Sequence, residues 1–246
     1  RTYPAKRKTC ATANTEKRTY AGVAYWEEEI NQLTTKTQNI MGKELIKISL
    51  TEFMNFVNKS GSAKSTVVSN SKNKRDEEYE HYKDYWLKLR EKLKSVHKKA
   101  QTHDDLRVLL DDIHPDKKAN YKAAIEGYIK FWKKRKIEWV NPPRKTWTVG
   151  DVKIELNPEL GLVVRDKIYI IKLFTTANTD INKMHADLIL NLMEKELREK
   201  VSGDEVVFGV LDVKRGKLFE NKNQDTSLYP LLNGEAKSFE TIWKAI

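Results

Sequence analysis

Residues 157–173, which read NPELGLVVRDKIYIIKL, contain the side chains best suited to chemistry. Lys172 interrupts an apolar run at 168–174 that predicts a buried strand. A lysine taken out of water there costs free energy unless a partner or ligand uses its charge. Glu159 follows Pro158 at a turn before this run. We therefore treat Glu159 and Lys172 as candidate site residues. The alternatives are a turn glutamate and a lysine whose ammonium reaches solvent at the sheet end.

The elements that would position these residues are predicted to be strands. Segments 160–164 and 168–174 are joined by Arg165-Asp166-Lys167, which is short enough for a hairpin. Segment 152–156 alternates apolar and charged residues, as a half-exposed strand does. Segment 206–213 is apolar on both faces, which is typical of a central strand. Between the last two strands a helix is predicted over 180–200, with its inward stripe at Ile181, Met184, Leu188 and Leu192.

Four earlier helices are predicted, at 21–38, 49–57, 77–99 and 117–136, the second with Ser49 or Thr51 as N-cap. The polar segment 58–76 is interpreted as a loop or linker with a short strand at 66–68. Asn141-Pro142-Pro143 stops the last helix and marks the transition to the strands. This order predicts an α+β protein in three parts: a basic arm at 1–20, a basic helical region at 21–116 and a core at 117–246.

The charge is unevenly distributed along the 246 residues. Residues 1–146 hold 32 Lys and Arg against 19 Asp and Glu, which gives this part a net charge of +13. The whole chain has a net charge of +11, so residues 147–246 carry −2. Such asymmetry indicates that the amino-terminal part meets a polyanion. The alternative is a solvated, lysine-rich helical surface.

Several classes of protein are disfavoured by the same sequence. No apolar run approaches the roughly 20 residues that cross a bilayer, so no membrane partner is expected. The single cysteine, Cys10, fits a reducing compartment, and we expect a cytoplasmic location. Residues 60–66 resemble a phosphate loop but have Ala63 where a second glycine is needed. The five histidines lack metal-ligand spacing, which disfavours zinc chemistry.

The order helix, three strands, helix, strand, with Pro158-Glu159 and Ile170-Ile171-Lys172 at their places in it, resembles the PD-(D/E)XK nuclease superfamily over residues 117–213. The resemblance implies an α-βββ-α-β core, a mixed sheet flanked by helices, following the helical region. It also implies a metal-dependent phosphodiesterase site in which Glu159 is the first acid and Lys172 the lysine. The cofactor would be Mg²⁺ or Mn²⁺ if the protein is active, and none otherwise.

The sequence departs from the family's pattern at Ile170, where the second acid would stand. A magnesium ion can bind one or two carboxylates plus substrate oxygens, so a migrated acid could replace it. Family members often carry a helper carboxylate on the first core helix, and Glu126 occupies that helix here. Glu126 is therefore a candidate catalytic residue and, with Glu159, a candidate metal ligand. Its alternative is a surface glutamate.

The basic run Lys133, Lys134, Arg135 and Lys136 is the candidate nucleic-acid contact, with Trp132 and Trp139 as stacking surfaces unless they belong to the core. We expect a nuclease-like protein that binds nucleic acid, DNA favoured over RNA, with catalysis weak or lost. One alternative is an active Mg²⁺- or Mn²⁺-dependent nuclease with a migrated carboxylate. Another is a noncatalytic module that binds an acidic protein partner.

Overall fold

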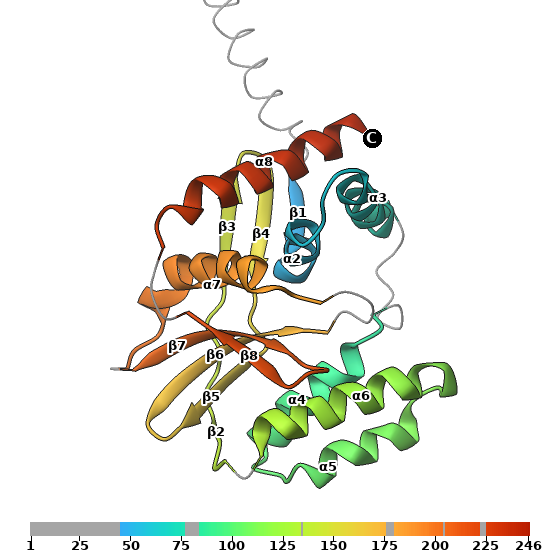
Figure 1. Cartoon of the computed structure of the whole chain (residues 1–246), viewed down its shortest axis with the longest axis vertical. Coiled ribbons are helices and arrows are strands. Elements are labelled where there is room, and N and C mark those ends of the chain that lie inside the picture. The colour runs from blue at the N-terminus through green and yellow to red at the C-terminus, as the bar shows by residue number, and fades with distance from the viewer. Residues whose placement is uncertain (1–44, 77–83, 134, 176–179, 204, 222–224) are drawn as a thin grey trace, which may run out of the picture. The chain divides into compact units, whose positions relative to one another are not determined.

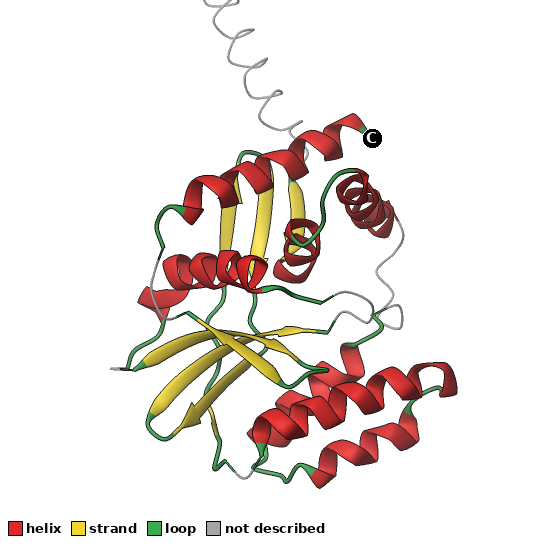
Figure 2. Cartoon of the chain, in the orientation of Figure 1, coloured by secondary structure: helices red, strands yellow, loops and turns green. Residues whose placement is uncertain are grey.

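The computed structural model describes residues 45–76, 84–133, 135–175, 180–203, 205–221 and 225–246. The predicted basic arm at 1–20 and helix at 21–38 lie outside the described residues. Helices and strands alternate in layers (Figure 2). The expected α+β class is confirmed.

A five-stranded mixed sheet holds the predicted hairpin. Its strands, in spatial order, are β2 (Glu138–Trp139), β5 (Leu160–Val164), β6 (Lys167–Phe174), β7 (Val206–Asp212) and β8 (Lys217–Glu220). β6 runs parallel to β7, and every other neighbouring pair is antiparallel. Arg165 and Asp166 have φ of 50° and 66°, the left-handed geometry of a two-residue hairpin turn. The predicted hairpin is confirmed, and segment 206–213 forms an interior strand as predicted, since β7 lies between β6 and β8.

A second sheet has three strands, in the order β1 (Ile46–Ser49), β4 (Val152–Leu156) and β3 (Lys145–Val149). β4 is the predicted strand at 152–156, with alternate residues buried. The prediction that three consecutive strands lie in one sheet is wrong for the first of them. β4 pairs with β1 and β3 rather than with β5. Alternation indicates a strand with one buried face but does not specify its neighbour.

The first described helix packs on this smaller sheet, and the second packs on the first. α2 (Leu50–Val57) confirms Ser49 as N-cap, in a reciprocal capping box with Glu52. α3 (Ser62–Asp76) replaces the predicted loop and short strand at 58–76. Its sequence is polar, yet Val68 is buried in the core and the helix lies against α8 (Leu228–Ala245). Tertiary packing, which local composition does not report, stabilises this helix.

One face of the five-stranded sheet is covered by α4 (Leu87–Lys98), α5 (Asp104–Arg107), the 3₁₀ helix η2 (Val108–Asp112) and α6 (Pro115–Trp132). α4 and α6 correspond to the helices predicted at 77–99 and 117–136, although residues 77–83 lie outside the described part. The apolar stripe of α6 faces the sheet, with Tyr121, Ile125, Tyr128 and Trp132 buried and Ile129 half-buried. Trp132 thus belongs to the core. α6 ends before the run at Lys133–Lys136, because Lys133 has a φ of 53°.

The opposite face is covered by α7 (Lys183–Leu197), which continues into η3 (Arg198–Lys200). Figure 1 shows α7 between the two sheets and α4 to α6 beyond the larger one. Leu188 and Leu192 point inward as predicted, but Met184 is 61% exposed. Two hydrophobic clusters therefore share the five-stranded sheet, one on each face.

Candidate functional site

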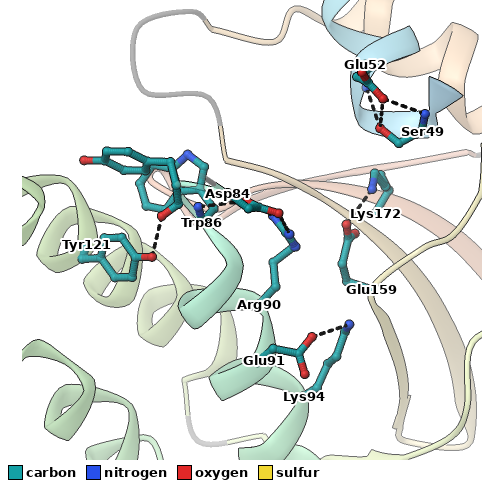
Figure 3. Close-up of polar contacts among 11 residues, drawn as sticks. Ser49, Glu52, Asp84, Trp86, Arg90, Glu91, Lys94, Tyr121, Glu159 and Lys172 are labelled. Atoms are coloured by element: carbon teal, nitrogen blue, oxygen red, sulfur yellow. Dashed lines mark hydrogen bonds and ion pairs between the residues drawn. The ribbon is translucent and has the colours of Figure 1, made fainter. Parts of the chain in front are cut away.

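The hairpin register brings Glu159 and Lys172 together. Leu160 lies opposite Ile171, so the next position out on each chain places Glu159 opposite Lys172. The Lys172 ammonium donates to Glu159 Oε1 at 2.5 Å, and the backbone N–H of Leu173 donates to Oε2 at 2.8 Å. Figure 3 shows the two side chains pointing at each other. The two predicted site residues form one ion pair.

This ion pair is buried inside the protein. The side chains of Lys172 and Glu159 are only 1% and 8% exposed. Lys172 lies between Ile170 and Phe174 along β6, and both belong to the hydrophobic cluster under α7. A buried pair recovers its desolvation cost only when further hydrogen bonds satisfy the charged groups, as the Leu173 amide does for Glu159.

A magnesium ion requires a near-octahedral set of oxygen ligands. Glu159 has both oxygens engaged by Lys172 and Leu173, and Ile170, at the position of the second acid, is a buried core residue. Within the described ranges no three His, Cys, Asp or Glu residues gather as metal ligands. The described residues thus do not fit a magnesium site in this arrangement. The use of Mg²⁺ or Mn²⁺ stays a prediction.

Glu126 is placed away from this pair. It is exposed on α6 and receives hydrogen bonds from the Arg107 guanidinium at 3.1 and 3.3 Å, which hold the pKa of its carboxyl below the usual value. α6 covers the sheet face that carries Ile171 and Leu173, whereas Lys172 projects to the other face. The structure therefore does not bring Glu126 to Glu159 and Lys172.

Asp212 is a buried carboxylate that is not among the predicted site residues. It ends β7 opposite Phe174 and is 4% exposed. The Arg215 guanidinium donates to Asp212 at 2.9 Å and also pairs with Asp180, and these hydrogen bonds raise the pKa of Arg215. An aspartate that ends the apolar run VVFGVLD was the available signal.

A cavity of about 430 Å³ gathers positive charge on the face that α6 covers. The cations that line it are Lys130, Lys133, Arg135, Arg165 and Lys167, against one carboxylate, Glu220. Lys167 pairs with Glu205 at 2.8 Å, but no ion pair joins Lys130, Lys133 or Arg165 to another described residue. Burying an anion among unpaired cations is favourable, so we name this feature the basic cavity.

The basic cavity includes part of the predicted nucleic-acid contact. Lys133 and Arg135 line it, and Arg135 also donates to the carbonyl of Phe131 at the end of α6. Lys136 instead points to Glu138 at 3.3 Å, and Lys134 lies outside the described residues. Arg165 and Lys167 were not predicted, because their contribution depends on how the hairpin folds back beside α6.

Comparison with protein-family models and with curated proteins gives no match to this chain. The PD-(D/E)XK resemblance therefore rests on the residues and their order.

Among the described helices, none has the length and apolar character needed to cross a membrane. A second, more open cavity adjoins the basic cavity, since Lys130 and Gly216 line both. Its other charged residues are Glu126, Lys214, Arg215 and Lys217.

Proposed function

We propose that this protein binds nucleic acid through the basic cavity and uses a nuclease-like core whose metal site is degenerate, with catalysis weak or lost. The observation that carries the proposal is the convergence of five cations from α6, its following turn and the β5–β6 hairpin on one concavity. Such a cluster suits a ligand with regularly spaced phosphates. Each contact between a cation and a phosphate releases counterions, which favours binding.

The arrangement of the core supports its nuclease-like part. α6 and α7 lie on opposite faces of the sheet, and β5, β6, α7 and β7 follow one another as the later elements of an α-βββ-α-β core do, with β6 parallel to β7. The first predicted strand, β4, departs from that core because it lies in the other sheet. The weak-catalysis part is supported by Glu159, whose oxygens are committed to Lys172 and Leu173. Fold alone does not assign activity, so binding is the better-supported half.

Binding is tested with a triple variant, Lys130→Gln, Lys133→Gly and Arg165→Asn. Glycine and asparagine are chosen because Lys133 and Arg165 have positive φ. The matched control is Lys47→Gln, Lys118→Gln and Lys153→Gln, which also removes three charges from the net +11 but none from the cavity. Anisotropy of labelled DNA and RNA oligonucleotides is measured against salt concentration.

The cavity variant is expected to bind at least about tenfold more weakly, with a salt slope shallower by about 2, while the control changes little. Equal losses in both triple variants would contradict a specific cavity. Tighter binding of polyglutamate than of DNA or RNA would instead support an acidic protein partner.

Catalysis is tested separately, by incubating the protein with linear and single-stranded DNA and RNA in Mg²⁺ or Mn²⁺. The comparison variant is the double substitution Glu159→Gln and Lys172→Met, which removes both charges of the buried pair together. We expect little cleavage, and any that occurs to be equal in both proteins. Cleavage by the unmodified protein that the double variant loses would establish an active nuclease and overturn the weak-catalysis proposal.

A further inference from the structure

The floor of the basic cavity is apolar, although its rim is cationic. Val164, Tyr169 and Leu218 line it and are half-buried, and all three come from the five-stranded sheet. α6 ends at Trp132, so the sheet extends beyond the helix that covers it. The cavity therefore offers a ligand two surfaces, one for apolar faces and one for negative charge.

These two surfaces distinguish between forms of nucleic acid. A duplex keeps its bases paired and stacked, so only its phosphates could reach the rim. An unpaired nucleotide can place its base against Tyr169 and its phosphate among the cations, because every base has a face that stacks on an aromatic ring. A concavity with an aromatic side chain in its floor suits the second form.

We propose that the basic cavity binds an unpaired nucleotide of a single strand, and that the strand continues into the adjoining open cavity. This inference rests on the proposed function and specifies its ligand. The continuation is argued from Lys130 and Gly216, which line both cavities. Lys214, which lines the second cavity and donates to Asn120 of α6 at 3.0 Å, is a cation for the next phosphate.

The partial negative charge at the carboxyl end of α6 would oppose a phosphate there. The protein offsets it with three cations at that end, Lys130, Lys133 and Arg135. The Arg135 guanidinium caps the Phe131 carbonyl at 3.0 Å, which removes one exposed acceptor from the anion's surroundings. The site can therefore hold a phosphate although it lies at the less favourable end of a helix.

The test compares single strands with duplexes in the full chain. Oligo-dT and oligo-U of about 12 nucleotides, within the range that single-strand grooves cover, are measured beside a duplex with the same number of base pairs. We expect the strands to bind at least about fivefold more tightly than the duplex, which corresponds to one stacked base. The dT and U arms separate DNA from RNA.

Two substitutions of Tyr169 separate stacking from charge. Tyr169→Val retains a residue suited to a strand but removes the ring, and we expect it to abolish most of the preference for the single strand. Tyr169→Phe keeps the ring and is expected to retain the preference. Thermal unfolding of both variants checks that the sheet is intact, and only folded variants are compared.

Lys214→Gln tests the continuation into the second cavity. It is expected to make the salt slope for the strand shallower by about 0.7, the contribution of one phosphate. Lys118→Gln, on the exposed first turn of α6, is the single-charge control and should leave the slope unchanged.

The outcomes also separate this inference from the proposed function. Equal binding of strand and duplex, with both weakened by the cavity triple variant, would overturn the single-strand inference and leave nucleic-acid binding standing. Binding that ignores the cavity cations would overturn both. An unchanged slope in Lys214→Gln would overturn the continuation.

Discussion

Lys172 is the residue at which the fold and the candidate site meet. It lies in the centre of a hydrophobic layer and is balanced there by Glu159, which also accepts the Leu173 amide. Replacing one charge of such a pair leaves the other buried and unpaired, which costs more than the pair itself contributes.

The single substitution Lys172→Met is therefore expected to lower the free energy of unfolding by about 3–5 kcal/mol. Adding Glu159→Gln removes the stranded charge and keeps an acceptor for Leu173, so the double variant should recover most of that loss. Urea unfolding of the three proteins measures both effects. A double variant no more stable than Lys172→Met would show that the carboxylate is not stranded.

His97 gives the stability a dependence on pH. The His97 side chain is 4% exposed, and its Nε2 lies 2.6 Å from the Tyr128 hydroxyl oxygen. Burial lowers the pKa of His97 from 6.5 to about 4. Because the unfolded chain binds a proton that the folded protein does not, stability is full above pH 6.5 and falls between pH 6.5 and about 4. The pKa difference corresponds to a loss of about 3 kcal/mol.

His97→Gln, which keeps a polar partner for Tyr128, should flatten the dependence between pH 6.5 and about 4 in urea unfolding. Carboxylates such as Glu240, whose pKa is lowered by hydrogen bonds from Lys244 and Lys237, lose their contribution at lower pH. They are unchanged in the variant and serve as the internal reference. If the free energy of unfolding fell in parallel in both proteins between pH 6.5 and about 4, the assignment to His97 would be contradicted.

At the scale of elements, the parts predicted from the sequence are those specified by local signals. The hairpin is set by the three residues between two apolar runs, and α2 by Ser49 and Glu52. The meeting of Glu159 and Lys172 follows from the hairpin register, so the sequence could predict it. The burial of this pair was harder to predict, because it depends on α7 covering the sheet.

The parts that were missed depend on distant partners. β1 has four residues and pairs with β4, which follows it by about 100 positions. α3 has little amphipathic character, and its buried Val68 and Ser71 are the signs of packing on the rest of the core. The basic cavity likewise joins α6 to a hairpin some 30 residues later. Sequence periodicity describes one segment at a time and cannot specify such neighbours.

The contact between α6 and the β7–β8 turn provides an element-scale prediction. A Cβ at Gly127 would lie 2.1 Å from the Val213 carbonyl oxygen, so only glycine allows this approach. Alanine is the better helix former by about 1 kcal/mol, yet Gly127→Ala is expected to destabilise the protein because the helix must move away from the turn. Thermal unfolding measures the sign.

Gly234→Ala is the control for helix propensity. Gly234 lies inside α8, and its Cβ would meet nothing within 4 Å. This substitution should stabilise the protein by about 0.4–1 kcal/mol. If both alanine variants were stabilised, the close approach of α6 to the turn would be disproved.

At the scale of the whole molecule, the five-stranded sheet joins two cores. Ile170 and Phe208 face the cluster under α7, while Ile171 and Leu211 face the cluster under α4 and α6. If the sheet came away from one cluster, the other cluster would be exposed as well. The Glu159–Lys172 pair and the basic cavity also lie on opposite faces of that sheet, so its integrity supports both.

We therefore expect residues 45–246 to unfold in a single transition. Leu232→Ala in the first cluster and Leu93→Ala in the second remove equivalent fully buried side chains, and each should cost about 2–5 kcal/mol.

Far-ultraviolet circular dichroism reports the helices of both clusters. Tryptophan fluorescence reports both clusters as well, because Trp243 and Trp147 lie in or against the first, and Trp86, Trp132 and Trp139 lie in or against the second. With a shared sheet, each variant should move the midpoints of both signals together. If either variant separated the two signals, the clusters would unfold independently, and the sheet would not couple the buried ion pair to the cavity.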